Sequence, residues 1–289
     1  MKLIALFILL VLGPVMKLLA QVGDDPFYRY GFPQEQIYVD IEQALSEAKE
    51  VKKLKLEAVD LSLIADKLDK FRTIKVLRLT NNQIDSLPDR MFEAGSLLYF
   101  ESIGNSFKHL PANFGKSKGL KELKIINAAI ADFPESMSEI RFLRRIEFQS
   151  FEVDSVEMLP FLGAQRSLEE VLLYKIPMND FPIRDSSSTT LKQVYMVNCQ
   201  LTKIDSSFWN NQLLEVLALD DNKIGEIPEE VLKLKLLKSL SLKNNNLKHL
   251  PEFIAKLPAL QVLNVSGNKI PYHELEIIRI LLPNCKIIY

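Results

Sequence analysis

The stretch LKSLSLKNNNLKHLPEFI, which runs from Leu237 to Ile254, decides the fold because variants of it recur through most of the chain. A close copy, LEVLALDDNKIGEIPEEV, begins at Leu214. The apolar position that opens each copy recurs every 23 residues, except for one step of 25 from Leu143 to Leu168. Its ten occupants are Val51, Ile74, Leu97, Leu120, Leu143, Leu168, Leu191, Leu214, Leu237 and Leu260. A period of about 20–50 residues is typical of a solenoid, whose repeats bury their apolar faces against one another.

Each copy predicts one short strand followed by a return segment. Leu240 and Leu242 alternate with Ser241, so the two leucines share one face of a strand and the serine lies on the other. Leu250 and Pro251 begin the return, because proline fixes φ and lacks the N–H that strand pairing needs. A strand of the same direction in every repeat gives a parallel sheet. Return segments bulkier than a strand would bend the stack and leave the sheet concave.

The motif L-x-x-L-x-L-x-x-N-x-L-x-x-L-P-x-x-[FIV] resembles the leucine-rich-repeat family, specifically its 23-residue class. The resemblance extends from Val51 to the C-terminus. It implies an α/β solenoid, a leucine-rich-repeat horseshoe whose concave parallel sheet has about ten to eleven strands, with helical caps at both ends. We expect Asp40–Glu50 and Tyr272–Leu282 to form the two cap helices, with Asp40 as an N-cap. A short last strand is expected at Cys285–Ile287.

The ninth position of the repeat holds an asparagine in five copies. They are Asn82, Asn105, Asn222, Asn245 and Asn268. An amide both donates and accepts, so it can satisfy buried backbone groups where the strand turns. The resemblance implies that these residues form a structural asparagine ladder. Repeats 4 to 7 carry Ala128, Phe151, Ile176 and Cys199 instead, so we expect the middle of the solenoid to depart from the family pattern.

The N-terminus, residues 1–20, resembles a secretory signal peptide. Lys2 precedes an apolar run at Leu3–Leu12, and a small residue follows at Ala20, so cleavage there would begin the mature chain at Gln21. The alternative is an uncleaved N-terminal anchor, because Lys17 stands unusually close to the expected cleavage site.

Residues 21–39 follow the signal and carry aromatic side chains among proline and glycine. This segment is either a loose linker, which we favour, or a packed arm. Residues 40–289 then form the leucine-rich-repeat domain, including both caps.

Charge and cysteine usage narrow the functional classes. Removal of Lys2 and Lys17 changes the formal net charge from −1 to −3, which argues against a general nucleic-acid binder. The two cysteines, Cys199 and Cys285, fall at positions expected to be buried, about four strands or roughly 19 Å apart, too far for a disulfide. By analogy, a signal peptide without disulfide-rich caps favours a bacterial exported protein. The three histidines have no sequence-local metal partner, and no motif of catalysis or cofactor binding occurs.

The concave face is the expected binding surface. Repeats 3 to 7 place aromatic and aliphatic side chains there among charges of both signs, which is the composition of binding hot spots. The expected partner-binding residues are Tyr99, Glu101, Ile103, Lys124, Ile126, Leu172, Tyr174, Tyr195 and Val197. The alternative is that they are scattered half-buried residues of an ordinary surface.

The sequence therefore predicts a secreted, periplasmic or cell-surface leucine-rich-repeat protein that binds a protein or peptide. We expect a monomer without enzymatic activity, cofactor or metal, which binds no nucleic acid and is not inserted in a membrane after signal cleavage. The alternative is a cytoplasmic or N-terminally anchored signalling scaffold, similar to the leucine-rich-repeat regulators of small GTPases and phosphatases.

Overall fold

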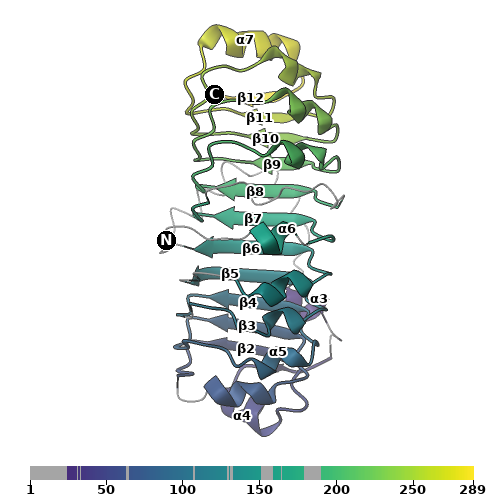
Figure 1. Ribbon diagram of the computed structural model, residues 1–289, viewed down its shortest axis with the longest axis vertical. Helices are drawn as coiled ribbons and strands as arrows, with labels where there is room; N and C mark the ends of the chain where they lie inside the picture. The colour runs from purple at the N-terminus through teal and green to yellow at the C-terminus, as the bar shows by residue number, and fades with distance from the viewer. Residues whose placement is uncertain are drawn as a thin grey trace.

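The computed structural model describes residues 25–30, 32, 34–62, 65–106, 108–128, 130, 133–150, 159–163, 165–178 and 190–289. The expected signal peptide, its cleavage site and Phe151 lie outside these residues. In the described part of the chain, twelve parallel strands form a single open sheet in chain order (Figure 1). They are β1 (Ile37–Tyr38), β2 (Lys53–Glu57), β3 (Val76–Thr80), β4 (Tyr99–Ile103), β5 (Glu122–Ala128), β6 (Arg145–Ser150), β7 (Glu170–Tyr174), β8 (Gln193–Val197), β9 (Val216–Ala218), β10 (Ser239–Ser241), β11 (Val262–Asn264) and β12 (Lys286–Ile288).

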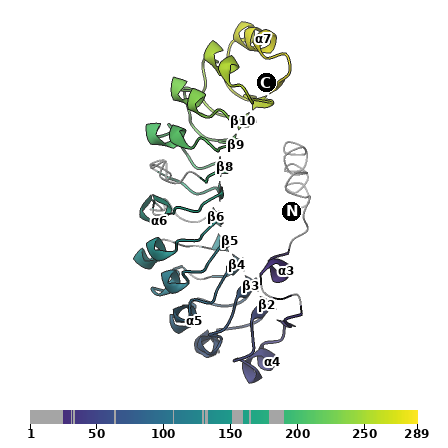
Figure 2. The same cartoon turned by 90° about the vertical axis from the view of Figure 1, so that its right-hand side faces the viewer.

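Short helical turns occupy the other side of the solenoid. They are η1 (Ala65–Lys70), α5 (Arg90–Glu93), η2 (Phe114–Lys116), η3 (Glu135–Glu139), α6 (Leu159–Gly163), η4 (Ser206–Asn210), η5 (Glu229–Lys233) and η6 (Glu252–Lys256). Pro134, Pro228 and Pro251 stand directly before η3, η5 and η6, as expected for a residue that ends strand pairing and presets φ for a turn. Figure 2 shows the strands on the inner side of the curve and these turns on the outer side. The repeats thus form the predicted concave sheet.

The hydrophobic core lies between the sheet and the return segments. Leu217, Leu240 and Leu263 stand in register on neighbouring strands, and none of them is more than 1% exposed. Each repeat therefore covers the apolar face of the previous one. Burial of one leucine side chain contributes roughly 1.5–3 kcal/mol, so removal of a core side chain such as that of Leu219 should cost about 2–5 kcal/mol.

The asparagine side chains form hydrogen bonds from one repeat to the next. The Asn245 amide donates to the carbonyls of Leu219 (2.9 Å) and Leu242 (3.1 Å), and its Oδ1 accepts from the Ile224 N–H at 2.9 Å. Asn82, Asn105, Asn222 and Asn268 likewise donate to a carbonyl of the preceding repeat. The amides therefore satisfy the backbone where each strand turns away from the sheet.

Helices stand at both ends of the stack. α4 (Ile41–Ser46) is shorter than expected, and Asp40 caps it by accepting from the Gln43 N–H at 2.7 Å. α7 (Tyr272–Leu281) buries Leu275 and Ile278 against the core.

The C-terminal register differs from the prediction. Ile287, not Cys285, pairs with Leu263, because the longer α7 replaces a normal return segment and the 23-residue period no longer holds. Cys285 therefore lies just before β12 and is half-buried, whereas Cys199 is fully buried as expected. Both thiols are free.

Candidate functional site

Charged side chains of alternating sign cross the concave face of the N-terminal half. Glu122, Arg145 and Glu170 are register partners on β5, β6 and β7. A second row of partners runs through Arg78, Glu101, Lys124 and Glu147 on β3 to β6. Opposite charges on adjacent strands attract one another, so the strand register itself pairs them.

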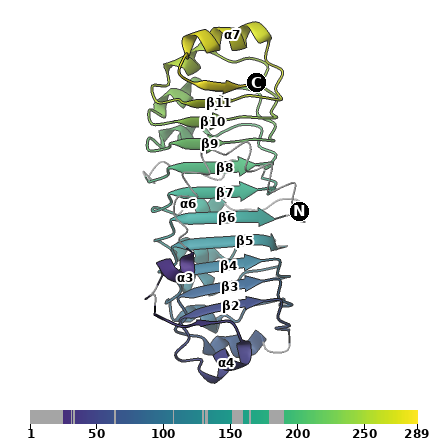
Figure 3. The same cartoon turned by 180° about the vertical axis from the view of Figure 1, so that it is seen from behind.

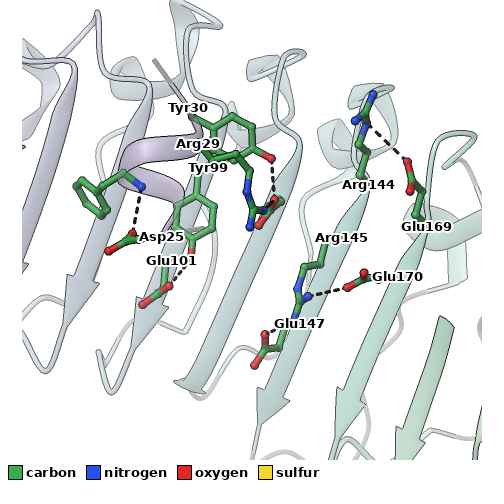
Figure 4. A network of polar contacts seen from close by, with 12 residues as sticks. Asp25, Arg29, Tyr30, Tyr99, Glu101, Arg144, Arg145, Glu147, Glu169 and Glu170 are labelled. Atoms are coloured by element: carbon green, nitrogen blue, oxygen red, sulfur yellow. Dashed lines mark hydrogen bonds and ion pairs between the residues drawn. The ribbon is translucent and has the colours of Figure 1, made fainter. Parts of the chain in front are cut away.

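Arg145 lies at the centre of this network (Figure 4). Its guanidinium is 2.6 Å from the Glu170 carboxylate and 3.2 Å from that of Glu147, which also contacts Lys124 at 3.3 Å. Burial lowers the pKa of Arg145, but the carboxylates of Glu170 and Glu147 outweigh burial and leave the pKa above its ordinary value. Exposed ion pairs are worth little individually, so the network's main effect is to fix the orientation of these side chains.

An N-terminal arm, defined here as residues 25–38, covers part of the same face. Figures 2 and 3 show α3 (Pro26–Arg29) on the concave side of the sheet, next to β3–β5. Phe27 is 1% exposed and packs with Tyr30, Val76 and Tyr99 in a cluster separate from the main core. The rings of Tyr30 and Tyr99 stack at 6.4 Å. The preferred interpretation of this segment as a loose linker is therefore wrong, because its aromatic side chains pack against apolar side chains of β3 and β4.

Polar contacts hold the α3 turn of the arm on both sides. The Tyr30 hydroxyl donates to the Glu122 carboxylate at 2.7 Å, and Arg29 contacts the same carboxylate. Burial, above all, and the hydrogen bond to Glu122 raise the pKa of Tyr30. On the other side Asp25 lies 3.4 Å from Arg78, whose guanidinium stands 5.0 Å from the centre of the Phe27 ring.

The arm lies over a region where two of the residues expected to bind a partner are buried. Tyr99 is 4% exposed beneath the arm, and its hydroxyl donates to Glu101. Glu101 is 6% exposed and also pairs with Arg78 at 3.0 Å. The prediction that both side chains are exposed is wrong. The sequence pattern of the strands does not show that another segment covers them.

The other expected residues lie on β4 to β8. Ile103, Lys124, Ile126, Tyr174 and Val197 are half-buried on the concave face. Leu172 and Tyr195 are nearly buried and form a second small cluster with Ala218. Tyr174 and Val216 pack against it. We name these five residues the concave cluster. Val216 and Ala218 were missed, although they occupy the same repeat positions as residues that the pattern singled out.

The family is visible in the repeats themselves. A family model described as leucine rich repeat matches residues 212–270. Those residues hold β9 to β11, whose geometry continues through the sheet to β2. This is a leucine-rich-repeat protein. A search of curated proteins finds no match to the chain.

Solved structures share this leucine-rich-repeat fold. A leucine-rich-repeat protein of Leptospira interrogans superposes with a TM-score of 0.61 at 24% identity, over 82% of this chain and 64% of the other. The present chain thus spans less than two thirds of that protein's length. An internalin of Listeria monocytogenes gives 0.63 at 16% identity, over 88% and 78% of the two chains. The leucine-rich-repeat ectodomain of the Arabidopsis thaliana receptor kinase GASSHO1/SCHENGEN3, in complex with CASPARIAN STRIP INTEGRITY FACTOR 2, gives 0.55 at 19%, over 78% and 34%.

The described part of the chain contains no group of three or more histidine, cysteine and carboxylate side chains that could hold a metal ion. Asp220, two residues after the end of β9, accepts hydrogen bonds from the Ser241 hydroxyl and from the Lys243 N–H. Burial raises the pKa of Asp220 more than these bonds lower it. Its role is therefore to hold neighbouring repeats together. None of the helices in the described residues is long and apolar enough to cross a membrane.

Proposed function

We propose that this chain is a non-enzymatic protein- or peptide-binding module of an exported leucine-rich-repeat protein. The ligand lies on the concave face of β5–β9, beside the arm. The concave cluster carries this proposal, because it gathers apolar and aromatic side chains on the face opposite to the main core. The cluster lies outside the main core, and apolar groups beside charges are typical of binding surfaces.

The charges beside the cluster support a polypeptide ligand. Arg145, Glu147 and Glu170 are fixed by one another and remain partly accessible. A peptide backbone or side chain of either sign can exchange hydrogen bonds with them while its apolar side chains meet Tyr174 and Val216. The chain shares its fold with a receptor ectodomain in complex with CASPARIAN STRIP INTEGRITY FACTOR 2 and with the plant peptide hormone receptor RGFR1 in complex with RGF2, which is consistent with such a ligand.

Export remains part of the proposal and rests on the sequence of residues 1–20. N-terminal sequencing of protein from its native host tests it directly. A mature chain that begins near Gln21 supports export, whereas an intact Met1 favours the anchored scaffold.

The binding site can be tested with a matched pair of variants. A partner is first captured by pull-down with the wild-type chain, and its affinity is then measured for Tyr174→Ala, Val216→Ala and Val262→Ala. Val216 and Val262 occupy the same row of the sheet on β9 and β11, and both are half-buried. Tyr174→Ala should weaken binding by more than about 1 kcal/mol and Val216→Ala by about half as much, whereas Val262→Ala should have no effect. Equal affinity of all four proteins would place the site elsewhere.

A further inference from the structure

The surface of the sheet against which the arm packs resembles a ligand-binding site. One row of the concave face reads Lys53, Val76, Tyr99 and Glu122 on β2 to β5. Two apolar side chains thus form a platform two strands wide, with a cation on one side and a carboxylate on the other. This row faces away from the core, so the adjacent side chains of Val76 and Tyr99 pack against the arm and not against the main core.

Both charged ends of this row bind the arm. The Lys53 ammonium donates to the Phe32 carbonyl at 2.9 Å. The Glu122 carboxylate accepts hydrogen bonds from the Tyr30 hydroxyl and the Arg29 guanidinium. Between them the Phe27 and Tyr30 rings cover the platform. Lys121 adds a cation 5.6 Å from the centre of the Tyr30 ring. Phe27, Arg29 and Tyr30 supply the contacts of Val76, Tyr99 and Glu122, and a separate peptide could supply the same groups.

The arm itself has the form of a short bound peptide. Asp25 caps the single turn of α3 by accepting from the Phe27 N–H at 3.1 Å, and this turn places Phe27 and Tyr30, three residues apart, on one face. Arg29, which stands between them in sequence, contacts the Glu122 carboxylate. The turn thus carries all three side chains that contact Val76, Tyr99 and Glu122.

We propose that the concave face of β3–β5 is a peptide-binding site and that residues 25–30 occupy it as an internal ligand. The external ligand that fits is a peptide with an acidic residue, an aromatic residue two positions later, and an arginine followed by a second aromatic residue. This inference rests on the proposed function and adds to it the chemistry of one partner and a means of regulation. A tethered segment acts at an effective concentration of roughly millimolar, so the arm blocks the site until a competing segment displaces it.

The test uses a fluorescent synthetic peptide with the sequence of residues 24–31, DDPFYRYG, and fluorescence polarisation. The receptor proteins are the wild type and the double variant Phe27→Ala/Tyr30→Ala, which loosens the arm and leaves the platform intact. The double variant should bind the peptide at least about tenfold more tightly than the wild type. A control peptide with alanine in place of both aromatic anchors should not bind. A folded double variant that binds neither peptide, or both peptides alike, overturns the proposal.

Two further variants separate this site from the one on β5–β9. In the double-variant background, Glu122→Gln should weaken peptide binding by about fivefold, and Tyr174→Ala should change it by less than about twofold. If Tyr174→Ala weakens peptide binding more than Glu122→Gln does, the present inference is wrong and the proposed function still holds. If the double variant does not fold, Arg29→Ala replaces it. That single change removes the contact with Glu122 and must raise the peptide affinity by about threefold, or the proposal fails.

Discussion

The Tyr30 hydroxyl donates to the Glu122 carboxylate across 2.7 Å, although 92 residues separate the two in sequence. Glu122 is a strand residue of the fourth repeat, and Tyr30 precedes the first. The contact therefore joins a non-repeating segment to the middle of the sheet. It adds a connection between distant repeats to a solenoid in which stability otherwise comes mainly from nearest neighbours.

This arrangement predicts that the arm opens without unfolding the repeats. Tyr30→Ala removes the ring from its seat and the hydrogen bond to Glu122, so the amides of Arg29 and Tyr30, which bond to Asp25 and Pro26, should lose protection. Hydrogen exchange followed by mass spectrometry can measure this. Leu240, far along the sheet, should keep its protection. Loss of protection at both places would show that the arm is part of the cooperative core.

High pH should weaken the fold through its buried tyrosines. Burial, with a further contribution from Glu170, raises the pKa of Tyr195 to about 12. Above the ordinary tyrosine pKa of about 10, the unfolded chain releases this proton while the folded chain keeps it, so stability falls as pH rises from about 10 to 12. Two pKa units correspond to about 2–3 kcal/mol for this side chain. Tyr30, Tyr99 and Tyr174 have their pKa raised in the same direction.

Urea unfolding at pH 8 and pH 11 checks this expectation. Tyr195→Phe should show a smaller loss of stability between the two pH values than the wild type, because it removes one of the titrating groups. An identical loss in both proteins would mean that Tyr195 ionises normally.

The asparagine ladder should carry stability that neighbouring exposed amides do not. Asn245→Ala leaves the Ile224 N–H and the carbonyls of Leu219 and Leu242 without their side-chain partner, which should cost about 1–3 kcal/mol. Asn246 is the next residue, is exposed, and makes one long side-chain contact at 3.4 Å. Chemical denaturation of Asn245→Ala and Asn246→Ala gives the comparison. Equal midpoints for the two variants would contradict the structural role of the ladder.

The repeat determined how much could be predicted from sequence. The positions of β2 to β11 follow from a 23-residue period with one step of 25, because each repeat packs its apolar residues against the next in the same register. The period carries no information about non-repeating segments. β1, the seat of the arm and the register of Cys285 therefore had to come from long-range packing.

The concave site was only half predictable for the same reason. Alternation within a strand correctly placed Tyr99, Tyr174 and Tyr195 on the concave face. It could not show that Phe27 and Tyr30 cover Tyr99, or that Tyr195 packs into a cluster with Leu172. Exposure on a curved sheet depends on neighbours that alternation does not specify.

The two thiols should differ in reactivity. Burial raises the pKa of Cys199 to about 12, and the residue is fully buried, so little thiolate is present or accessible at neutral pH. Cys285 is half-buried at the C-terminal end. A thiol reagent should therefore label Cys285 first under native conditions and Cys199 only after unfolding, as mass spectrometry of the labelled peptides can show. Labelling of Cys199 before Cys285 would contradict the placement of both residues.

Cys199 also occupies the position of a missing ladder amide. Its sulfur lies 3.5 Å from the Leu173 carbonyl, the group to which a ladder asparagine here would donate, since Asn222 donates to the corresponding Met196 carbonyl at 2.7 Å. A thiol is a weaker donor and acceptor than an amide. Cys199→Asn should therefore extend the ladder by one repeat and stabilise the protein by about 1 kcal/mol.

Cys199→Ala is the matched control for this change. It removes the sulfur without adding an amide, so it should be less stable than the wild type by about 1 kcal/mol or more. Urea denaturation of the three proteins should give the order asparagine, cysteine, alanine from most to least stable. If Cys199→Asn is no more stable than Cys199→Ala, the backbone groups around this position are not arranged to accept an amide. The asparagine ladder would then end at Asn222 because of local geometry and not because of the residue at position 199.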